Sequence, residues 1–226
     1  VNQAAFGLRG FESLPLHQNK TISTADRFIL GSEQTCMADP IYFVTTNRRK
    51  CEEYQEIVAK HGVLLERYDA ELVEPQSTDT MHIIEHKLAQ AKNLLPGKRV
   101  LVDDRCFTIP ALNGFPGPML KLVLKTVGID GFLRLMQGKQ DRRAEFITSL
   151  GYFDGRDDLF FQTKEEGFLL EAPKGDNLRG WNELLCIYGY KSFPGKSLAE
   201  YTDEEWSAYL DELNDVDVMK QFLRHL

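Results

Sequence analysis

The chain has 226 residues, of which 42% are hydrophobic and 27% charged, and 27 Lys and Arg against 34 Asp and Glu give a formal net charge of -7. These proportions fit one well-cored globular domain, with or without an appendage, and exclude a collagenous or wholly disordered chain. The acidic balance also disfavours a DNA or RNA partner, because such polymers are held by clustered Lys and Arg.

The sequence gives no sign of a membrane or secretory segment. No apolar run approaches the ~20 residues that a bilayer span needs, and the first residues lack a basic segment followed by an apolar core. The four cysteines, Cys36, Cys51, Cys106 and Cys186, are far apart and form no C-x-x-C pair. This spacing indicates reduced thiols rather than disulfides or a zinc site. We therefore expect a cytoplasmic protein with no membrane partner.

Residues 1–39 are rich in Ser, Thr, Asn and Gln and contain no long periodic segment. We interpret them as an N-terminal extension and expect one domain over residues 40–226. This domain is predicted to begin with a buried strand over 41–46 (IYFVTT) and, after a helix, a second strand over 63–68. The helix is expected to present four residues on one face, Tyr54, Ile57, Val58 and His61.

The rest of the domain alternates between helical and extended patterns. Apolar residues recur in steps of three and four over 81–95, which predicts an amphipathic helix that stops at Pro-Gly 96–97. A short buried strand over 99–102 is then expected to end in two aspartates. Later segments predict helices over 120–127 and 129–136, strands over 144–153, 159–163 and 168–170, and helices over 206–213 and 216–226. This order, without an internal repeat, predicts a mixed α/β architecture.

The segment Thr45-x-Asn47-x-x-Lys50 lies between the first predicted strand and helix. Free backbone N–H groups at a helix start, with a short side-chain donor and a lysine, form a natural phosphate cradle. The alternative is an ordinary capped helix with a solvated lysine. Neither a Walker loop nor a G-x-G-x-x-G segment is present in the chain.

Two further segments carry candidate chemistry. Asp103 and Asp104 follow an apolar run, and adjacent carboxylates at the mouth of a sheet are costly unless they are solvated, hydrogen-bonded or share a cation. Their hard oxygen ligands suit Mg²⁺, whereas the alternative is an exposed turn. The Gly- and Pro-rich loop 113–118, followed by Lys121, either approaches a ligand closely or is a plain loop-to-helix junction.

In this order, the motifs resemble those of the inosine triphosphate pyrophosphatase family, also called the Ham1 family. Its members carry T-G-N-x-x-K after a strand, a V-E-D or A-D-D segment, and A-L-x-G-x-P-G-x. The corresponding segments are TTNRRK at 45–50, VDD at 102–104 and ALNGFPGPMLK at 111–121, with APKG at 172–175 similar to the family's P-R-G turn and GWN at 180–182 similar to its F-G-W-D loop. The resemblance covers roughly residues 40–212.

The resemblance implies a two-lobed α/β fold with a long curved mixed sheet, flanking helices and a central cleft. It further implies a homodimeric, Mg²⁺-dependent hydrolase that cleaves a nucleoside triphosphate such as ITP, XTP or dITP to the monophosphate and pyrophosphate. The implied substrate-binding residues are Thr45, Asn47, Lys50, Lys121, Lys174, Arg179, Trp181 and Asn182. The implied metal ligands are Asp103, Asp104 and Asp79, with Asp104 as general base and Asp103 and Lys50 beside it in catalysis.

Three departures from the family pattern concern the phosphate loop and the base pocket. Thr46 replaces the glycine of T-G-N, and in the F-G-W-D loop Arg179 replaces the aromatic residue and Asn182 the aspartate. An arginine can still stack on a base. The S-H-R signature, which contacts the purine 6-keto group, is absent, and its place holds Leu-Asp-Glu at 210–212. We expect these carboxylates to favour an amino group or to repel the anion.

The leading hypothesis is a divergent Mg²⁺-dependent nucleoside triphosphate pyrophosphatase with a rebuilt base pocket. Two alternatives stay open: a phosphohydrolase that acts on another nucleotide, and a nucleotide-binding or interaction domain with little turnover. The acidic pair together with Lys50 and Lys121 favours an enzyme, whereas the missing S-H-R signature favours binding alone.

Overall fold

A seven-stranded mixed sheet organises the computed structural model, which describes residues 39–179, 181–213 and 217–226. The strand order is β2-β1-β3-β5-β6-β7, and β4 pairs separately with β3. β1 runs parallel to β2 and β3, and the other pairs are antiparallel. The strands are β1 (Ile41–Val44), β2 (Leu65–Tyr68), β3 (Val100–Thr108), β4 (Pro116–Gly117), β5 (Arg143–Phe153), β6 (Asp158–Leu169) and β7 (Tyr188–Tyr190).

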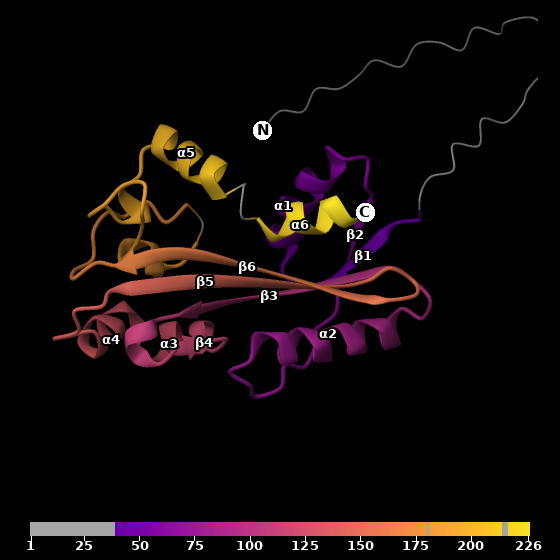
Figure 1. Cartoon of the computed structure of the whole chain (residues 1–226), viewed down its shortest axis with the longest axis horizontal. Coiled ribbons are helices and arrows are strands. Elements are labelled where there is room, and N and C mark those ends of the chain that lie inside the picture. The colour runs from indigo at the N-terminus through magenta and orange to yellow at the C-terminus, as the bar shows by residue number, and fades with distance from the viewer. Residues whose placement is uncertain (1–38, 180, 214–216) are drawn as a thin grey trace, which may run out of the picture. The chain divides into compact units, whose positions relative to one another are not determined.

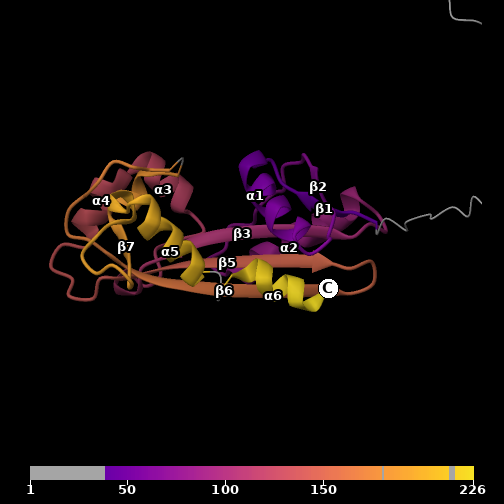
Figure 2. The ribbon, with the colours of Figure 1, turned by 90° about the horizontal axis from the view of Figure 1, so that it is seen from above.

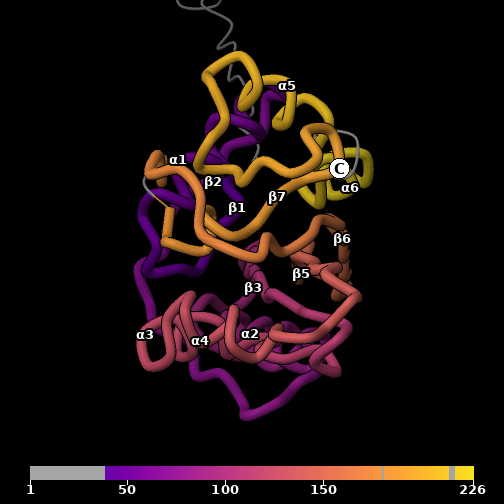
Figure 3. The backbone as a smooth tube through the Cα atoms, turned by 90° about the vertical axis from the view of Figure 1, so that its left-hand side faces the viewer, coloured from indigo at the N-terminus to yellow at the C-terminus, as the bar shows by residue number. Residues whose placement is uncertain are grey.

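Helices cover both faces of the sheet. They are α1 (Arg48–Ala59), α2 (Thr80–Leu94), α3 (Leu120–Thr126), α4 (Gly128–Leu135), α5 (Asp203–Leu213) and α6 (Val218–His225), with short 3-10 turns η2 (Pro110–Leu112), η3 (Glu183–Cys186) and η4 (Leu198–Glu200). In Figure 1, α1, α5 and α6 lie above the sheet and α2, α3 and α4 below it. The end-on view of Figure 3 shows the same layers, with α5 on one side of β3, β5 and β6 and α2, α3 and α4 on the other.

Two groups of elements gather at the two ends of the long strands β3, β5 and β6. Figure 2 shows α3, α4, α5 and β7 at one end, and α1, α2, α6, β1 and β2 at the other. Each group has its own buried apolar side chains. The mixed α/β fold with helices around one sheet is therefore confirmed, and the two groups correspond to the two lobes that the sequence resemblance implied.

Strand β3 sends alternate side chains to different helices. Leu101 is buried with residues of α1 and α6, whereas Val100 and Val102 are buried with residues of α2. On the α2 side, Gly151 of β5 allows close packing, because a Cβ at this position would lie 2.8 Å from a methyl carbon of Ile84. The alternation assigns the odd-numbered residues of β3 to the α1 face and the even-numbered ones to the α2 face.

Two strand predictions were too short. The strand expected over 99–102 continues to Thr108, and the strands expected over 159–163 and 168–170 are a single strand, β6. The cause is β5, which pairs without interruption with β3 on one side and β6 on the other. Backbone pairing with so long a neighbour keeps charged residues in the extended conformation, although they interrupt the apolar pattern of the sequence.

Three further predictions concern the N-terminal extension, the cysteines and membrane-spanning segments. The expected extension over residues 1–39 lies outside the described residues except for Asp39, and Cys36 also lies outside them. The boundary of the domain therefore stays a prediction. Cys51, Cys106 and Cys186 are free thiols. No helix within the described ranges has the length and apolar character that a bilayer span requires.

We expect Phe222→Ala to lower the free energy of unfolding by about 3–5 kcal/mol, because it removes a fully buried ring from the core beneath α6. The Phe222 ring packs edge-on against Tyr152 at a centroid distance of 4.9 Å. Chemical denaturation followed by circular dichroism measures the loss. Leu226→Ala is the control just beyond the end of the same helix, since Leu226 is the C-cap of α6 and is 50% exposed. Equal losses for both variants would contradict this account of α6.

Candidate active site

Strand β3 lacks a neighbouring strand along part of one edge. Its pairing with β1 ends at Leu101 and its pairing with β4 begins at Phe107, while β5 pairs with the opposite edge throughout. Within the described residues, 102–106 of β3 therefore have no strand partner on the β1 side, and we call this segment the open edge. β1 ends beside it at Val44. In α/β sheets, ligands bind beyond the carboxyl ends of parallel strands, so the open edge is a natural ligand position.

The segment after β1 forms a helix start that suits an anion. Asn47 caps α1 by accepting a hydrogen bond from the backbone N of Lys50 at 3.1 Å, and Thr45 Oγ1 accepts one from the backbone N of Asn47 at 3.1 Å. The first turn contains no acidic residue but carries Arg48, Arg49 and Lys50. Basic side chains at a helix N-terminus oppose the helix dipole, so an external anion would stabilise this turn.

Lys50 is not the solvated lysine of the plain capped-helix alternative. Its Nζ lies 2.8 Å from Oδ2 of Asp103, whose side chain is only 4% exposed. The hydroxyl of Tyr54 donates to the same carboxylate oxygen at 3.1 Å. Burial and the neighbouring Asp103 raise the pKa of Tyr54 well above its usual value, so this hydroxyl remains a donor. The structure thus joins the predicted cradle to the first of the two aspartates.

Asp104 lies on the opposite face of the sheet, toward α2. Its Oδ1 is 3.5 Å from Nζ of Lys87, and the same ammonium is 2.9 Å from Oε1 of Glu74. Burial raises the pKa of Asp104; the positive charge of Lys87 lowers it, and the negative charges of Glu74 and Asp103 raise it further, for a net increase. A carboxylate with a raised pKa accepts a proton more readily from water, as a general base must.

The predicted position of the acidic pair was wrong. Asp103 and Asp104 do not end a strand at the mouth of the sheet, because β3 continues to Thr108. Adjacent residues of a strand point to opposite faces, so the two carboxylates flank the open edge from its two sides. Asp79 accepts a hydrogen bond from the backbone N of Met81 at 2.9 Å and caps α2. Glu74, rather than Asp79, is the further acidic residue in the Lys87 cluster.

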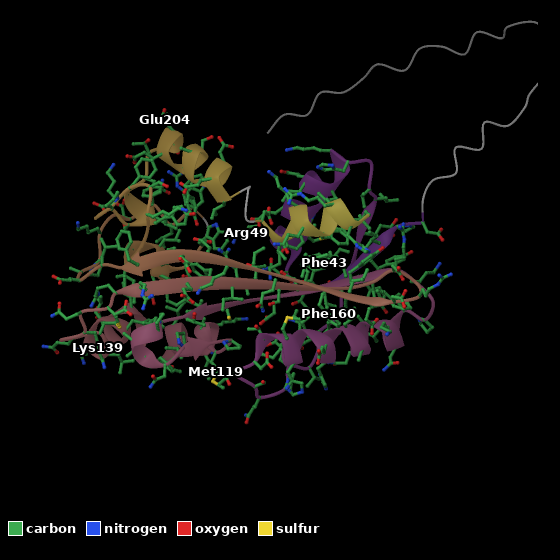
Figure 4. All side chains as sticks on the ribbon, viewed as in Figure 1. Phe43, Arg49, Met119, Lys139, Phe160 and Glu204 are labelled. Atoms are coloured by element: carbon green, nitrogen blue, oxygen red, sulfur yellow. The ribbon has the colours of Figure 1, made fainter. Side chains whose placement is uncertain are left out.

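A cleft of about 820 Å³ opens on the face that carries Asp103. Side chains of α1 and of the start of α6 line one wall, and side chains around η3 and α5 line the other. Arg49, labelled in Figure 4, reaches into this region from α1. Five predicted site residues line the cleft, namely Asn47, Lys50, Asp103, Arg179 and Trp181. Six others do not, namely Thr45, Asp79, Asp104, Lys121, Lys174 and Asn182.

A charged cluster that the sequence did not reveal forms the floor of the cleft. Arg105 lies two residues beyond Asp103 on the same face of β3, and its Nη2 is 2.9 Å from Oε2 of Glu165. The other oxygen of Glu165 accepts hydrogen bonds from the hydroxyls of Tyr209 at 2.7 Å and Tyr188 at 3.1 Å. The buried carboxylate is therefore compensated by one cation and two phenols.

The Trp181 ring contacts two arginines. The guanidinium carbon of Arg105 is 5.0 Å from the Trp181 ring centroid, and that of Arg49 is 5.1 Å from it. Arg105 also lies 4.3 Å over the ring of Phe146. Cations over aromatic faces are favourable when they are desolvated, so these contacts hold the indole at the floor of the cleft.

Arg179 forms hydrogen bonds that connect its loop to α5 and to the residues before α5. Its guanidinium is therefore not free to stack on a base. Its guanidinium donates to Asp203 at 2.9 Å and to the backbone oxygens of Tyr201 at 2.6 Å and Thr202 at 3.2 Å. It also lies 4.9 Å over the ring of Trp206. Because these contacts occupy both terminal nitrogens and one face of the guanidinium, Arg179 acts first as an anchor for the loop.

The remaining predicted lysines and Asn182 lie outside the cleft. Lys174 donates to the backbone oxygen of Gly195 at 2.8 Å, and Asn182 caps η3 by accepting a hydrogen bond from Leu184 N at 3.0 Å. Lys121 is exposed on α3, which follows β4 at the far end of the open edge. Lys174 and Asn182 therefore have hydrogen-bond partners within the protein, and Lys121 is exposed on the surface of α3.

The expectation for the Leu-Asp-Glu segment at 210–212 was also wrong. Only Leu210 of these three residues lines the cleft. Glu212 accepts a hydrogen bond from Ser192 and forms an ion pair with Lys191 at 3.0 Å. Its carboxylate is therefore engaged with the segment after β7 and does not face a ligand in the cleft.

The sequence contains signals for two of the residues that were missed. Lys87 is spaced three residues after Ile84 and four before Ala91, which places a lysine on the buried face of an amphipathic helix. Such a lysine requires a carboxylate partner. Continuing the strand alternation beyond Asp103 would have placed Arg105 on the same face. Glu74 has no comparable signal, because it lies in the irregular segment before α2.

The amino-acid sequence of this chain is similar to those of known nucleotide pyrophosphatases. The model of the Ham1 family matches residues 41–211. The dITP/XTP pyrophosphatase of Methanopyrus kandleri is 34% identical over 153 residues, which are 67% of this chain and 81% of that protein. The inosine triphosphate pyrophosphatase of Yarrowia lipolytica is 32% identical over 185 residues, which are 81% of this chain and 95% of that protein.

Solved structures share the fold. A nucleoside-triphosphatase / dITP/XTP pyrophosphatase from Mycobacterium abscessus matches with a TM-score of 0.64 and 18% identity, over 77% of this chain and 95% of that one. A HAM1 protein from Coxiella burnetii matches with a TM-score of 0.62 and 20% identity, over 83% of this chain and 95% of that one.

Arg179→Met is expected to loosen the loop before η3, because it removes the hydrogen bonds to Asp203 and to the backbone of α5's approach segment. Amide hydrogen exchange of residues 177–179 and 181 should become at least several-fold faster. Arg143→Met is the control, since it breaks an exposed ion pair with Asp141 elsewhere. Unchanged exchange in Arg179→Met would show that the loop is held by other contacts.

Proposed function

Because the chain belongs to the Ham1 family, whose model matches residues 41–211, we propose that it hydrolyses a nucleoside triphosphate to a monophosphate and pyrophosphate. Relatives named dITP/XTP pyrophosphatase and inosine triphosphate pyrophosphatase make ITP, dITP and XTP the first substrates to test. The observation that carries the proposal is the meeting of a basic helix start, Lys50 and two carboxylates at the open edge.

In this proposal the phosphate chain lies along the open edge, beside the start of α1. The free N–H groups of the first helical turn and the ammonium of Lys50 neutralise its negative charge. Lys50 is already paired with Asp103 at 2.8 Å and is partly exposed, so it can contact a phosphate oxygen without leaving that partner. Thr45 and Asn47 act by shaping this turn, since their side chains accept hydrogen bonds from its backbone.

The acidic residues fit a hard divalent cation such as Mg²⁺. Asp104 and Glu74 present carboxylate oxygens around the same ammonium of Lys87, and Asp103 flanks the open edge from the other face. Within the described residues, no three acidic, histidine or cysteine side chains form a ready-made metal cage. Mg²⁺ is commonly held by one or two carboxylates together with substrate phosphates, and in this proposal Asp103 and Asp104 supply the carboxylates. When bound, the ion would withdraw charge from the phosphoryl oxygens.

Asp104 is the proposed general base. A water oxygen forms a bond to the α-phosphorus, the bond from the α-phosphorus to the bridging oxygen breaks, and pyrophosphate leaves with that oxygen. The proton of the water passes to the Asp104 carboxylate, whose raised pKa favours this transfer. Lys87 lies beside Asp104 and holds its carboxylate in place at 3.5 Å.

Two properties implied by the family resemblance belong to the proposal. The first is a homodimer, which sedimentation of the purified chain would test. The second is a reducing, cytoplasm-like location, which the free thiols of Cys51, Cys106 and Cys186 support.

The proposed reaction predicts that the protein with Mg²⁺ releases pyrophosphate from ITP, dITP or XTP. Asp104→Asn should lower this rate by roughly 100-fold or more, because the amide cannot accept the proton. Separating pyrophosphate from orthophosphate by ion chromatography measures the products. Asp158→Asn is the control, since Asp158 pairs with Lys92 at 2.7 Å away from the open edge.

Two outcomes would contradict the proposal in different ways. Orthophosphate as the sole phosphate product would favour a phosphohydrolase that acts on another nucleotide. Saturable nucleotide binding by the wild type with no product would favour the binding domain that the altered base pocket suggests.

Lys50→Ala is expected to weaken the binding of a triphosphate much more than that of the matching monophosphate, because Lys50 contacts the outer phosphates in this proposal. Titration calorimetry with ITP in the presence of Ca²⁺ and with IMP compares the two losses. Lys60→Ala serves as the control, since Lys60 lies at the other end of α1 and is exposed. Equal losses for both nucleotides would show that Lys50 does not contact the outer phosphates.

A further inference from the structure

We call the part of the cleft around Arg105 the slot. Aromatic and aliphatic side chains line it, among them Trp181, Trp206, Tyr209 and Leu210, together with the polar side chains of Thr148, Thr163 and Glu165. Apolar walls with a few polar groups that fix orientation are typical of sites for heteroaromatic ligands. The slot lies on the same face of β3 as Lys50 and Asp103, so a nucleotide with its phosphates at the open edge would direct its base into it.

Arg105 is the charged donor on the floor of this slot with unused hydrogen-bonding capacity. One terminal nitrogen donates to Glu165 at 2.9 Å, but the Nε atom is buried and has no hydrogen-bond partner. The Arg105 side chain lines the cleft and is 26% exposed, so a ligand in the cleft can contact the guanidinium. Arg179 also lines the cleft with an unpartnered Nε, but both of its terminal nitrogens are engaged with α5 and its approach segment.

The position of Arg105 relative to Asp103, beside which the phosphates are proposed to lie, is fixed by strand β3. It follows Asp103 by two residues on one strand, which is about 6.7 Å along the sheet. Its guanidinium contacts Glu165, Phe146 and Trp181, and these contacts hold it in place. A guanidinium held in place at the floor of the slot favours ligands that present hydrogen-bond acceptors to it and disfavours ligands that present donors.

We propose that Arg105 is the residue of this chain that selects the base, by donating to the keto oxygen and N7 of a 6-oxopurine. Hypoxanthine, xanthine and guanine present two acceptors on this edge, whereas adenine presents an amino donor beside N7, which the guanidinium cannot satisfy. Arg105 thus supplies donors that the Leu-Asp-Glu segment at 210–212 does not. The inference rests on the proposed function only in that a nucleotide occupies the cleft.

Binding of the monophosphates IMP and AMP to the full-length protein tests this role without any turnover. The wild type is expected to bind IMP more tightly than AMP. Arg105→Met should weaken IMP binding by roughly tenfold or more and leave AMP binding nearly unchanged, because only IMP makes the bidentate contact. Titration calorimetry gives both dissociation constants, and circular dichroism checks that each variant is folded.

Two further variants separate base selection from a structural role. Arg105→Lys keeps a positive charge against Glu165 but lacks the planar pair of donors, so the preference for IMP should fall as in Arg105→Met. Arg143→Met is the control, because it removes an arginine whose exposed ion pair with Asp141 lies away from the cleft lining, and it should leave the preference intact. Equal losses of IMP and AMP binding in the Arg105 variants, or a wild type without a preference for IMP, would overturn the inference.

The same data distinguish this inference from the proposed reaction. If the wild type prefers IMP through Arg105 but releases no pyrophosphate from triphosphates, the reaction is wrong and the base selection stands. If pyrophosphate is released but the preference survives in both Arg105 variants, the reaction stands and the base selection is wrong.

Discussion

The site depends on the early end of one strand. β1 stops at Val44, while β3 continues for several residues beyond the point where the two are paired, supported on its other edge by β5. This difference in length leaves the open edge, and it directs the start of α1 to the same place. A longer β1 would satisfy the backbone of β3 but would fill the space in which phosphates are proposed to lie.

Because the open edge is part of a strand, its side chains alternate between the two faces of the sheet and have different neighbours on each face. On one face, Lys50, Asp103 and Arg105 follow one another toward the aromatic slot, in the order expected for phosphates and then a base. On the other face, Lys87 lies between Asp104 and Glu74. Because adjacent residues of a strand point to opposite faces, Asp103 pairs with Lys50 in the cleft whereas Asp104 pairs with Lys87 on the other side of the sheet.

The sequence was sufficient for most of the helices and for the capped start of α1, because both follow from local periodicity and capping. Asn47 caps a helix after a buried strand, as its spacing indicated. The lengths of β3 and β6 were not predictable locally, since pairing with β5 extends them through charged residues. The contacts of Arg179 with Asp203 and of Arg105 with Glu165 join residues distant in the chain, and one sequence contains no local trace of them.

Helix α2 packs closely on β5, and the same helix carries Lys87, which pairs with Asp104 and Glu74. Gly151 leaves no room for even one methyl group against Ile84, and Ile84 lies one helical turn before Lys87. A side chain at this glycine would force Ile84 to shift, on the same helix that carries the lysine paired with Asp104. A substitution at Gly151 can therefore disturb the acidic cluster from the back of the sheet, although Gly151 does not line the cleft.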